Sequence, residues 1–151
     1  MNDTTSSGRW REALGLLILR LGLAWFLTVW AVNKILAPVQ YQKIWGYFHG
    51  IDIGTSAPYY MAAAQIAICA CIALGLWRVV TYALGFVMHG VTVIVILPAL
   101  IAPFVIENGF PTNRNQAIAL AVLGGFAALW LLRHRDHWSL DAMIAGRRGP
   151  E

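Results

Sequence analysis

Two cations lie along the first long apolar stretch of the chain, where a charge is costly. Arg20 is seven residues beyond Ala13, near which the stretch begins, and Lys34 stands fourteen residues further on. Fourteen residues are nearly four turns of an α-helix, so both side chains fall on one face. An Arg at the centre of a bilayer helix costs about 2.5–3.5 kcal/mol on insertion scales. A cation held at that cost could bind an anion, a quinone carbonyl or the carboxylate of a partner protein.

The acids of the chain lie outside its four long apolar stretches. Arg20 therefore has no counter-ion at its own depth, and the nearest candidates are Glu12, Asp136 and Asp141. Two interpretations stay open. Either Arg20 and Lys34 form a binding site, or Arg20 extends to lipid phosphate while Lys34 only marks the end of a helix.

A third titratable group stands near the middle of the third apolar stretch. Tyr82, His89 and Thr92 are spaced to form one polar stripe on a helix, and we expect this stripe to face the interior of a bundle. We expect His89 to contact the second or fourth helix, with Gln65 as its favoured partner. The imidazole could carry a proton, bond a quinone or ligate a metal. It could equally be a neutral His that fastens two helices together.

The remaining reactive side chains argue against self-contained catalysis. Cys69 and Cys71 are two residues apart, so on a helix they point about 200° away from each other. They cannot form the Cys-x-x-Cys pair of thiol-redox enzymes, and buried cysteines usually act as small hydrophobes. We predict no catalytic residue and no metal ligand. The candidate ligand-binding residues are Arg20, Lys34, Gln65, Tyr82 and His89.

Four apolar stretches must position these side chains, and they span residues 13–35, 58–77, 79–103 and 115–132. A helix of about 20 residues crosses the ~30 Å hydrocarbon core of a bilayer. Hydrophobic residues make up 59% of the chain and charged residues 12%, against about 25% charged in soluble domains. We predict an all-α, multi-pass membrane protein with one domain over residues 1–151. Short connections favour an up-down bundle of four transmembrane helices, with disordered ends at residues 1–9 and 144–151.

The first connection contains a helical pattern of its own. Pro38 suits a first helical position and Gly50 a C-terminal cap. Between them, one helical stripe is formed by Tyr41, Ile44, Trp45 and Phe48. The pattern predicts a short amphipathic helix on the outer membrane surface, although a loop whose aromatic residues dip into the interface fits nearly as well.

Two further signals concern the helix ends near the third connection, between the third and fourth apolar stretches. Pro98 and Pro103 predict a kink or unwinding at the outer end of the third helix. Asn113 with Gln116 three residues later resembles a capping box ahead of the fourth helix.

The net charge of +4 is distributed unevenly about the four stretches. Seven cations flank one side of the predicted bilayer, namely Arg9, Arg11, Arg78, Arg133, Arg135, Arg147 and Arg148. Three flank the other side: Lys34, Lys43 and Arg114. The positive-inside rule then places both termini in the cytoplasm. Membrane topology explains the basic balance, so we expect no nucleic-acid partner.

The segment Leu19–Phe26, followed by Asn33–Pro38, resembles the start of the DoxX family of small bacterial membrane proteins. Members typically begin with an apolar helix of the form Arg-x-x-x-Gly-x-x-Phe, with Lys and then Pro shortly after it. Here Gly22 follows Arg20 by only two residues, and Trp30–Val32 stand where many members have Gly. The length and four-helix layout are also similar to those of DoxX and its relative MauE. The resemblance implies a bacterial inner-membrane protein linked to redox or thiol metabolism, and DoxD-type relatives form the membrane subunit of thiosulfate:quinone oxidoreductase.

Three functions are consistent with these residues. The first is an accessory subunit of a membrane redox system, with a quinone cofactor or a partner reductase engaged near Arg20 and His89. The second is a scaffold or assembly factor with no small-molecule site. The third is a small-solute transporter, but small four-helix exporters generally use a carboxylate in the first helix, where this chain has Arg20. The expected partners are the lipid bilayer and a membrane or peripheral redox protein. The chain could also form a homo-oligomer.

Overall fold

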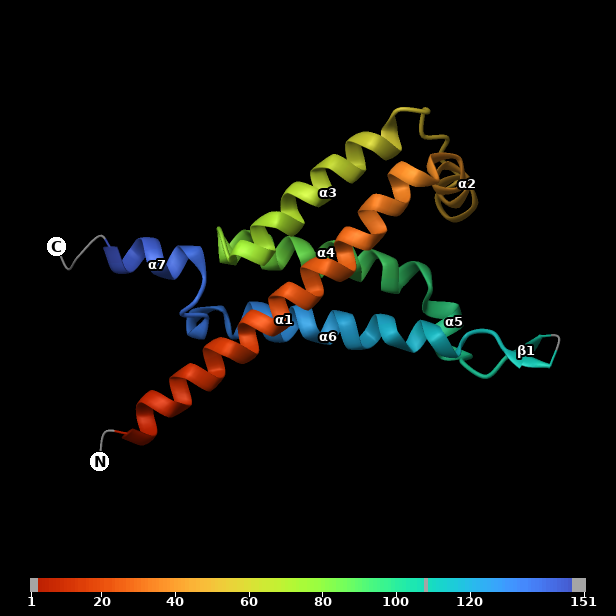
Figure 1. The fold of residues 1–151 in the computed structure, drawn as a ribbon. Coiled ribbons are helices and arrows are strands. Elements are labelled where there is room, and N and C mark those ends of the chain that lie inside the picture. Colours follow the sequence, from red (N-terminus) through yellow and green to blue (C-terminus); the bar gives the residue numbers. More distant parts are fainter. Residues whose placement is uncertain (1–2, 108, 148–151) are drawn as a thin grey trace.

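The computed structural model describes residues 3–107 and 109–147, with side chains described over 8–47, 50–107 and 109–146. The described part of the chain is mostly helical, at 79%. Its helices are α1 (Asp3–Leu36), α2 (Pro38–His49), α3 (Ala57–Leu74), α4 (Arg78–Val95), α5 (Leu97–Ile101), α6 (Ala117–Leu131) and α7 (Leu140–Arg147) (Figure 1). Short 3-10 helices cover Arg114–Gln116 (η1) and Arg133–Arg135 (η2), and two antiparallel strands cover Ile106–Glu107 (β1) and Phe110–Pro111 (β2).

Within these residues, four helical segments are long and apolar enough to cross a membrane. They are Gly8–Leu36, Ala57–Leu74, Arg78–Val95 and Arg114–Leu131. The prediction of a mostly helical chain with four such helices is confirmed. The surface of these helices is strongly apolar, since Trp25 is 70% exposed and Ile94 71% exposed. Large apolar side chains turned outward in such numbers are unusual for a monomer that faces water.

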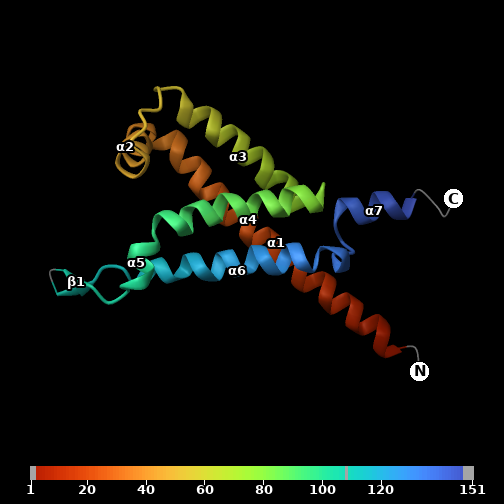
Figure 2. The same ribbon diagram turned by 180° about the vertical axis from the view of Figure 1, so that it is seen from behind.

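The four long helices pack in two close pairs, α1 with α3 and α4 with α6, and α3–α4 and α1–α6 contacts join the pairs. Figures 1 and 2 both show α4 beside α6, with α1 crossing them obliquely. The buried core is formed by Leu16, Leu23, Ala24, Leu27, Cys69, Ile72, Tyr82, Phe126 and Leu129. Gly85 permits the close approach of α4 and α6, because a Cβ there would lie 2.5 Å from Cε1 of Phe126.

The molecule has two distinct ends. The start of α1, the turn between α3 and α4, and α7 lie at one end, which we call the terminal end (Figures 1 and 2). The helices α2 and α5 and the β1–β2 hairpin lie at the opposite end, which we call the α2 end.

The first connection forms the predicted helix, α2, so the alternative of a loop is wrong. Pro38 stands in its first turn, and Gly50 ends it in the left-handed conformation at φ 64°, with its N–H bonded to Gly46 O. The next helix, α3, ends at Leu74 rather than at residue 77. Gly75 takes a left-handed φ of 67° and donates to the carbonyls of the last turn, which stops the helix there.

The third predicted stretch is divided into two helices. α4 ends at Val95, and α5 begins at Leu97 with Pro98 in its first turn, where a residue without an N–H is tolerated. The predicted break near Pro98 is therefore confirmed. The predicted capping box is wrong, because Asn113 makes no side-chain cap and its Nδ2 instead donates to Ala102 O at 3.1 Å. The β1–β2 hairpin was not predicted.

The disorder predicted at the two ends of the chain is not what the structure shows for the residues it describes. α1 begins at Asp3, and α7 covers Leu140–Arg147, while residues 1–2 and 148–151 lie outside the described part. Extending an established helix adds one hydrogen bond for each residue that is ordered, so α1 can continue beyond its apolar part. α7 is capped by Ser139, whose Oγ accepts the N–H of Ala142 at 3.3 Å.

Candidate functional site

Arg20 is buried, and its partner is Asp136, 116 positions further along the chain. Nη1 of Arg20 lies 3.2 Å and 3.0 Å from the two carboxylate oxygens, and Nη2 donates to Trp138 O at 2.8 Å. The hydroxyl of Tyr82 donates to Oδ2 of Asp136 at 2.7 Å. Arg20 is 4% exposed, and Asp136 and Tyr82 are fully buried. We call these four residues the Arg20–Asp136 cluster.

Asp136 reaches this position because the chain turns back immediately after α6. The short helix η2 ends before Asp136, whose carbonyl accepts hydrogen bonds from Nη1 of Arg78 at 2.9 Å and from Oγ of Ser139 at 2.7 Å. Asp141 fastens the same segment to the start of α4, since its carboxylate accepts the N–H groups of Trp77 and Arg78 at 2.9 Å and 2.8 Å. The C-terminal segment is thus tied to the α3–α4 turn by several polar contacts.

Gly75 leaves the room in which the Arg20 guanidinium lies. A Cβ at this residue would be 2.5 Å from Nη1 of Arg20 and 2.5 Å from Cβ of Ser139. The residue that ends α3 therefore also sets the space available to the buried ion pair.

The chemistry of the Arg20–Asp136 cluster is that of a closed ion pair. A buried cation needs a counter-charge, because its desolvation costs several kcal/mol. Asp136 supplies that charge, and Tyr82 and Trp138 satisfy further hydrogen-bonding positions. Within the described side chains, only Nε of Arg20 is buried without a hydrogen-bond partner. Arg20 is turned inward to an acid, so the interpretation in which it extends to lipid phosphate is wrong for this structure.

Lys34 is buried with a different set of partners. Its Nζ donates to Gln65 Oε1 at 2.7 Å and lies 3.3 Å from Trp30 O. The amide of Gln65 donates in turn to Leu27 O at 2.7 Å, and the ring of Tyr41 lies 4.9 Å from Nζ. We call Lys34 and Gln65 the Lys34–Gln65 pair.

The Lys34–Gln65 pair carries an uncompensated charge. Lys34 is 9% exposed and Gln65 7% exposed. The ion pairs found among the described residues are Arg20–Asp136, Arg78–Asp141 and Arg135–Glu12. Lys34 is in none of them, so neutral groups alone balance its ammonium in this part of the chain.

His89 stands apart from both groups. Its Nε2 is 2.9 Å from Ala119 O, which can only accept, so Nε2 carries a proton in this contact. The ring packs edge-on against Phe26 at 5.5 Å and lies 6.3 Å from the ring of Phe126. The predicted contact with the fourth long helix is confirmed, whereas Gln65 as the favoured partner is wrong. His89 fastens α4 to α6.

The predicted polar stripe on α4 is only partly correct. Tyr82 and His89 face the interior, but Thr92 is exposed. The five candidate residues are divided by the structure into Arg20 with Tyr82, Lys34 with Gln65, and His89 alone.

The cysteines and the metal-ligating side chains add no further site. Cys69 is buried in the core and Cys71 is half-buried, and neither forms a disulfide. Over the described side chains, no group of three His, Cys, Asp or Glu residues could hold a metal ion.

No protein-family model, curated protein or solved structure matches the chain. The polar groups between its helices are therefore the basis on which a function can be proposed.

Proposed function

We propose that this protein is a DoxX-like, multi-pass inner-membrane protein that acts as an accessory, quinone-interacting subunit of a membrane redox system. The quinone carbonyl would accept a hydrogen bond from the ammonium of Lys34, beside Gln65. The proposal is supported by the four apolar helices, by the family-like segment Leu19–Pro38 within and after α1, and by the buried charge of Lys34.

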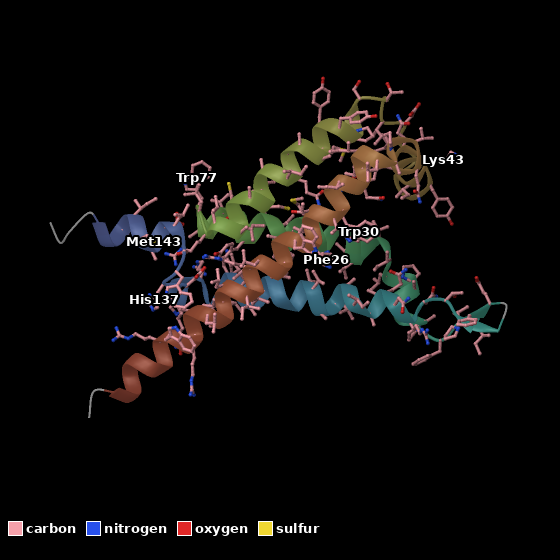
Figure 3. All side chains as sticks on the ribbon, viewed as in Figure 1. Phe26, Trp30, Lys43, Trp77, His137 and Met143 are labelled. Atoms are coloured by element: carbon pink, nitrogen blue, oxygen red, sulfur yellow. The ribbon has the colours of Figure 1, made fainter. Side chains whose placement is uncertain are left out.

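The orientation that we propose is an up-down bundle with both termini in the cytoplasm. The terminal end carries the cations Arg9, Arg11, Arg78, Arg133 and Arg135, and the α2 end carries Lys34, Lys43 and Arg114. Figure 3 shows Trp77, His137 and Met143 at the terminal end and Lys43 at the α2 end. The excess of cations at the terminal end supports placing that end on the cytoplasmic side.

The observation that carries the quinone proposal is the charge of Lys34 in a candidate membrane helix without a carboxylate partner in the described structure. An ammonium has three donors, and Gln65 Oε1 and Trp30 O account for two. Keeping a cation buried costs stability. A ligand that brings a third, neutral acceptor to the ammonium would explain why the chain retains Lys34 there. A quinone carbonyl is such an acceptor, and it is compatible with an apolar environment.

A binding titration tests this proposal. The protein would be purified in dodecylmaltoside and titrated with decylubiquinone, with quenching of Trp fluorescence as the readout. We expect Lys34→Met to weaken binding about tenfold or more, because a hydrogen bond from a charged donor is lost. Lys43→Met is the matched control, since Lys43 is exposed on α2. Equal affinities for wild type and Lys34→Met would contradict the quinone site.

A scaffold or assembly factor is the second candidate, and the Arg20–Asp136 cluster favours it. Both terminal nitrogens of Arg20 are occupied by Asp136 and Trp138, so that guanidinium is not free to bind a ligand. Affinity purification from native membranes distinguishes the two functions. A redox partner captured together with quinone supports the first, whereas a partner captured equally by wild type and Lys34→Met, with no quinone in the lipid extract, supports the scaffold.

A further inference from the structure

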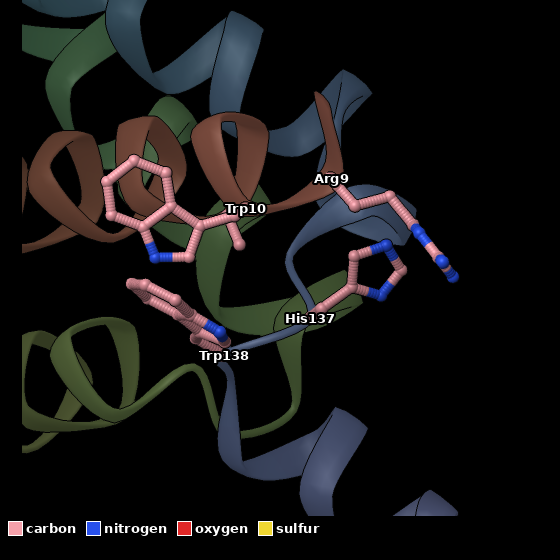
Figure 4. A pocket seen from close by; sticks show the side chains of 5 residues that line it. Arg9, Trp10, His137 and Trp138 are labelled. Atoms are coloured by element: carbon pink, nitrogen blue, oxygen red, sulfur yellow. The ribbon is translucent and has the colours of Figure 1, made fainter. Parts of the chain in front are cut away.

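A cavity of about 270 Å³ opens at the terminal end, away from Lys34. It is lined by Arg9, Trp10, Ala13, His137 and Trp138. The rings of Trp10 and Trp138 meet nearly at right angles, with centroids 6.4 Å apart and an interplanar angle of 74°. Figure 4 shows the two indoles together on one side, and Arg9 beside His137 on the other.

Arg9 supplies a positive charge at this cavity. Among the described side chains no carboxylate lines it, and Glu12 and Asp136, which stand near its lining residues in the sequence, already have cationic partners. Glu12 accepts from Nη1 of Arg135 at 3.0 Å, and Asp136 is paired with Arg20. Arg9 and His137 are exposed, so both can reach a ligand from outside. The cavity therefore fits an anion that also tolerates an aromatic and apolar wall.

We propose that this cavity binds the phosphate group of an anionic phospholipid. Arg9 would donate to a phosphate oxygen, and the Trp10–Trp138 pair would lie against the glycerol and the first acyl carbons. The depth agrees with this assignment, because the cavity is at the start of the first candidate membrane segment, Gly8–Leu36. Trp residues concentrate at the headgroup level of bilayers, and basic pockets there bind anionic headgroups.

The buried ion pair fixes one wall of the proposed lipid site. Nη2 of Arg20 donates to the carbonyl oxygen of Trp138, which holds the backbone of that residue against α1. The N-terminal part of α1 and the C-terminal segment thus form the site together, and a bound lipid would join them from the membrane side. This site is separate from the Lys34–Gln65 pair and does not depend on the quinone proposal.

A lipid titration followed by native mass spectrometry tests the site. The whole protein in dodecylmaltoside would be titrated with phosphatidylglycerol, phosphatidylcholine or inorganic phosphate. We expect phosphatidylglycerol to bind more tightly than phosphatidylcholine, and Arg9→Gln to weaken it about fivefold, as for one cation at a membrane surface. Trp10→Ala should also weaken it. The matched controls Arg11→Gln and Trp25→Ala, exposed on the same helix but outside the cavity, should bind as wild type does.

Three results would overturn the assignment. Equal losses of affinity for phosphatidylglycerol in Arg9→Gln and Arg11→Gln would show that surface charge attracts the lipid without a defined site. Equal affinities for the two lipids would show that the negative charge is not recognised. Inorganic phosphate bound as tightly as phosphatidylglycerol would show a free-phosphate site instead of a lipid site.

Discussion

Two buried cations of α1 lie in opposite electrostatic situations. Arg20 lies toward the terminal end and contacts the carboxylate of Asp136, which also accepts a hydrogen bond from the Tyr82 hydroxyl. The second terminal nitrogen of Arg20 donates to a backbone carbonyl. Lys34 is fourteen residues further along the same helix, about 21 Å away at 1.5 Å per residue. It contacts one amide oxygen and one backbone carbonyl, and in the described structure it has no acid.

We infer from this difference that the two cations of α1 have different roles. Removing one member of a buried ion pair leaves the other charge without compensation, which strongly destabilises a fold. Removing a cation that only neutral groups surround leaves no opposite charge behind. We therefore expect stability to depend on the Arg20–Asp136 cluster, and we expect the Lys34–Gln65 pair to matter for binding more than for stability. The predictions below test this contrast.

The largest effect is expected from Asp136→Asn. This variant keeps the size of the side chain but leaves the buried Arg20 guanidinium without a counter-charge, at a cost of about 3–5 kcal/mol. Unfolding by SDS in dodecylmaltoside micelles measures it. Glu12→Gln is the control, because its pair with Arg135 is exposed and should contribute about 0–1 kcal/mol.

The double variant Arg20→Met with Asp136→Leu sharpens this test. It removes both charges together, so it should be more stable than Asp136→Asn alone. A double variant less stable than the single one would show that the two side chains do not act as a charge pair.

Gly75→Ala is expected to have the next largest effect. A left-handed φ costs an L-residue about 1–2 kcal/mol, and the added Cβ would crowd Arg20 and Ser139 at 2.5 Å, which costs about 1–3 kcal/mol more. Gly50→Ala is the matched control, with φ 64° and no atom within 4 Å of the added Cβ. If both variants lose the same stability in the SDS assay, the space around Arg20 is not a constraint.

The sequence was sufficient to predict the long helices but not the contacts between them. Unbroken apolar stretches identify four helices because length and hydropathy are local properties. The sequence offers Glu12, Asp136 and Asp141 as possible counter-ions of Arg20, and no local pattern singles out Asp136 among them. Its burial depends on a chain reversal after α6 that brings together residues 116 positions apart. Local patterns carry no information on such a contact.

The partners of His89 and Lys34 show a second limit. The acceptor of His89 is the backbone carbonyl of Ala119, and backbone carbonyls have no signature in a sequence. Gln65 was expected to bond His89, but the packing of α3 against α1 places it beside Lys34 instead. The sequence correctly identifies these residues as buried polar groups. Which of them pair with one another depends on which helices are neighbours.

Tyr82→Phe should have a smaller effect on stability than Asp136→Asn or Gly75→Ala. It removes the hydrogen bond from the phenol to Asp136 Oδ2 but leaves both contacts of that carboxylate with Arg20, so we expect a loss of about 1.5 kcal/mol. The SDS-unfolding midpoint measures this loss. Tyr60→Phe, at a side chain that is 76% exposed, should change stability by less than about 0.5 kcal/mol. Equal behaviour of the two variants would show that the phenol is not part of the cluster.

The smallest effect on stability is expected from Lys34→Met, which bears most directly on the contrast between the two cations. The variant loses the hydrogen bond from a charged donor to Gln65 Oε1, which costs about 1.5–3 kcal/mol. It also removes the desolvation penalty of a buried ammonium that no acid among the described residues offsets, and Met packs with a similar shape. The two terms oppose each other, so the net change should stay within about 1 kcal/mol in the SDS assay. A loss as large as that of Asp136→Asn would mean that Lys34 has a structural counter-charge, and the division between a stabilising and a binding cation along α1 would then be wrong.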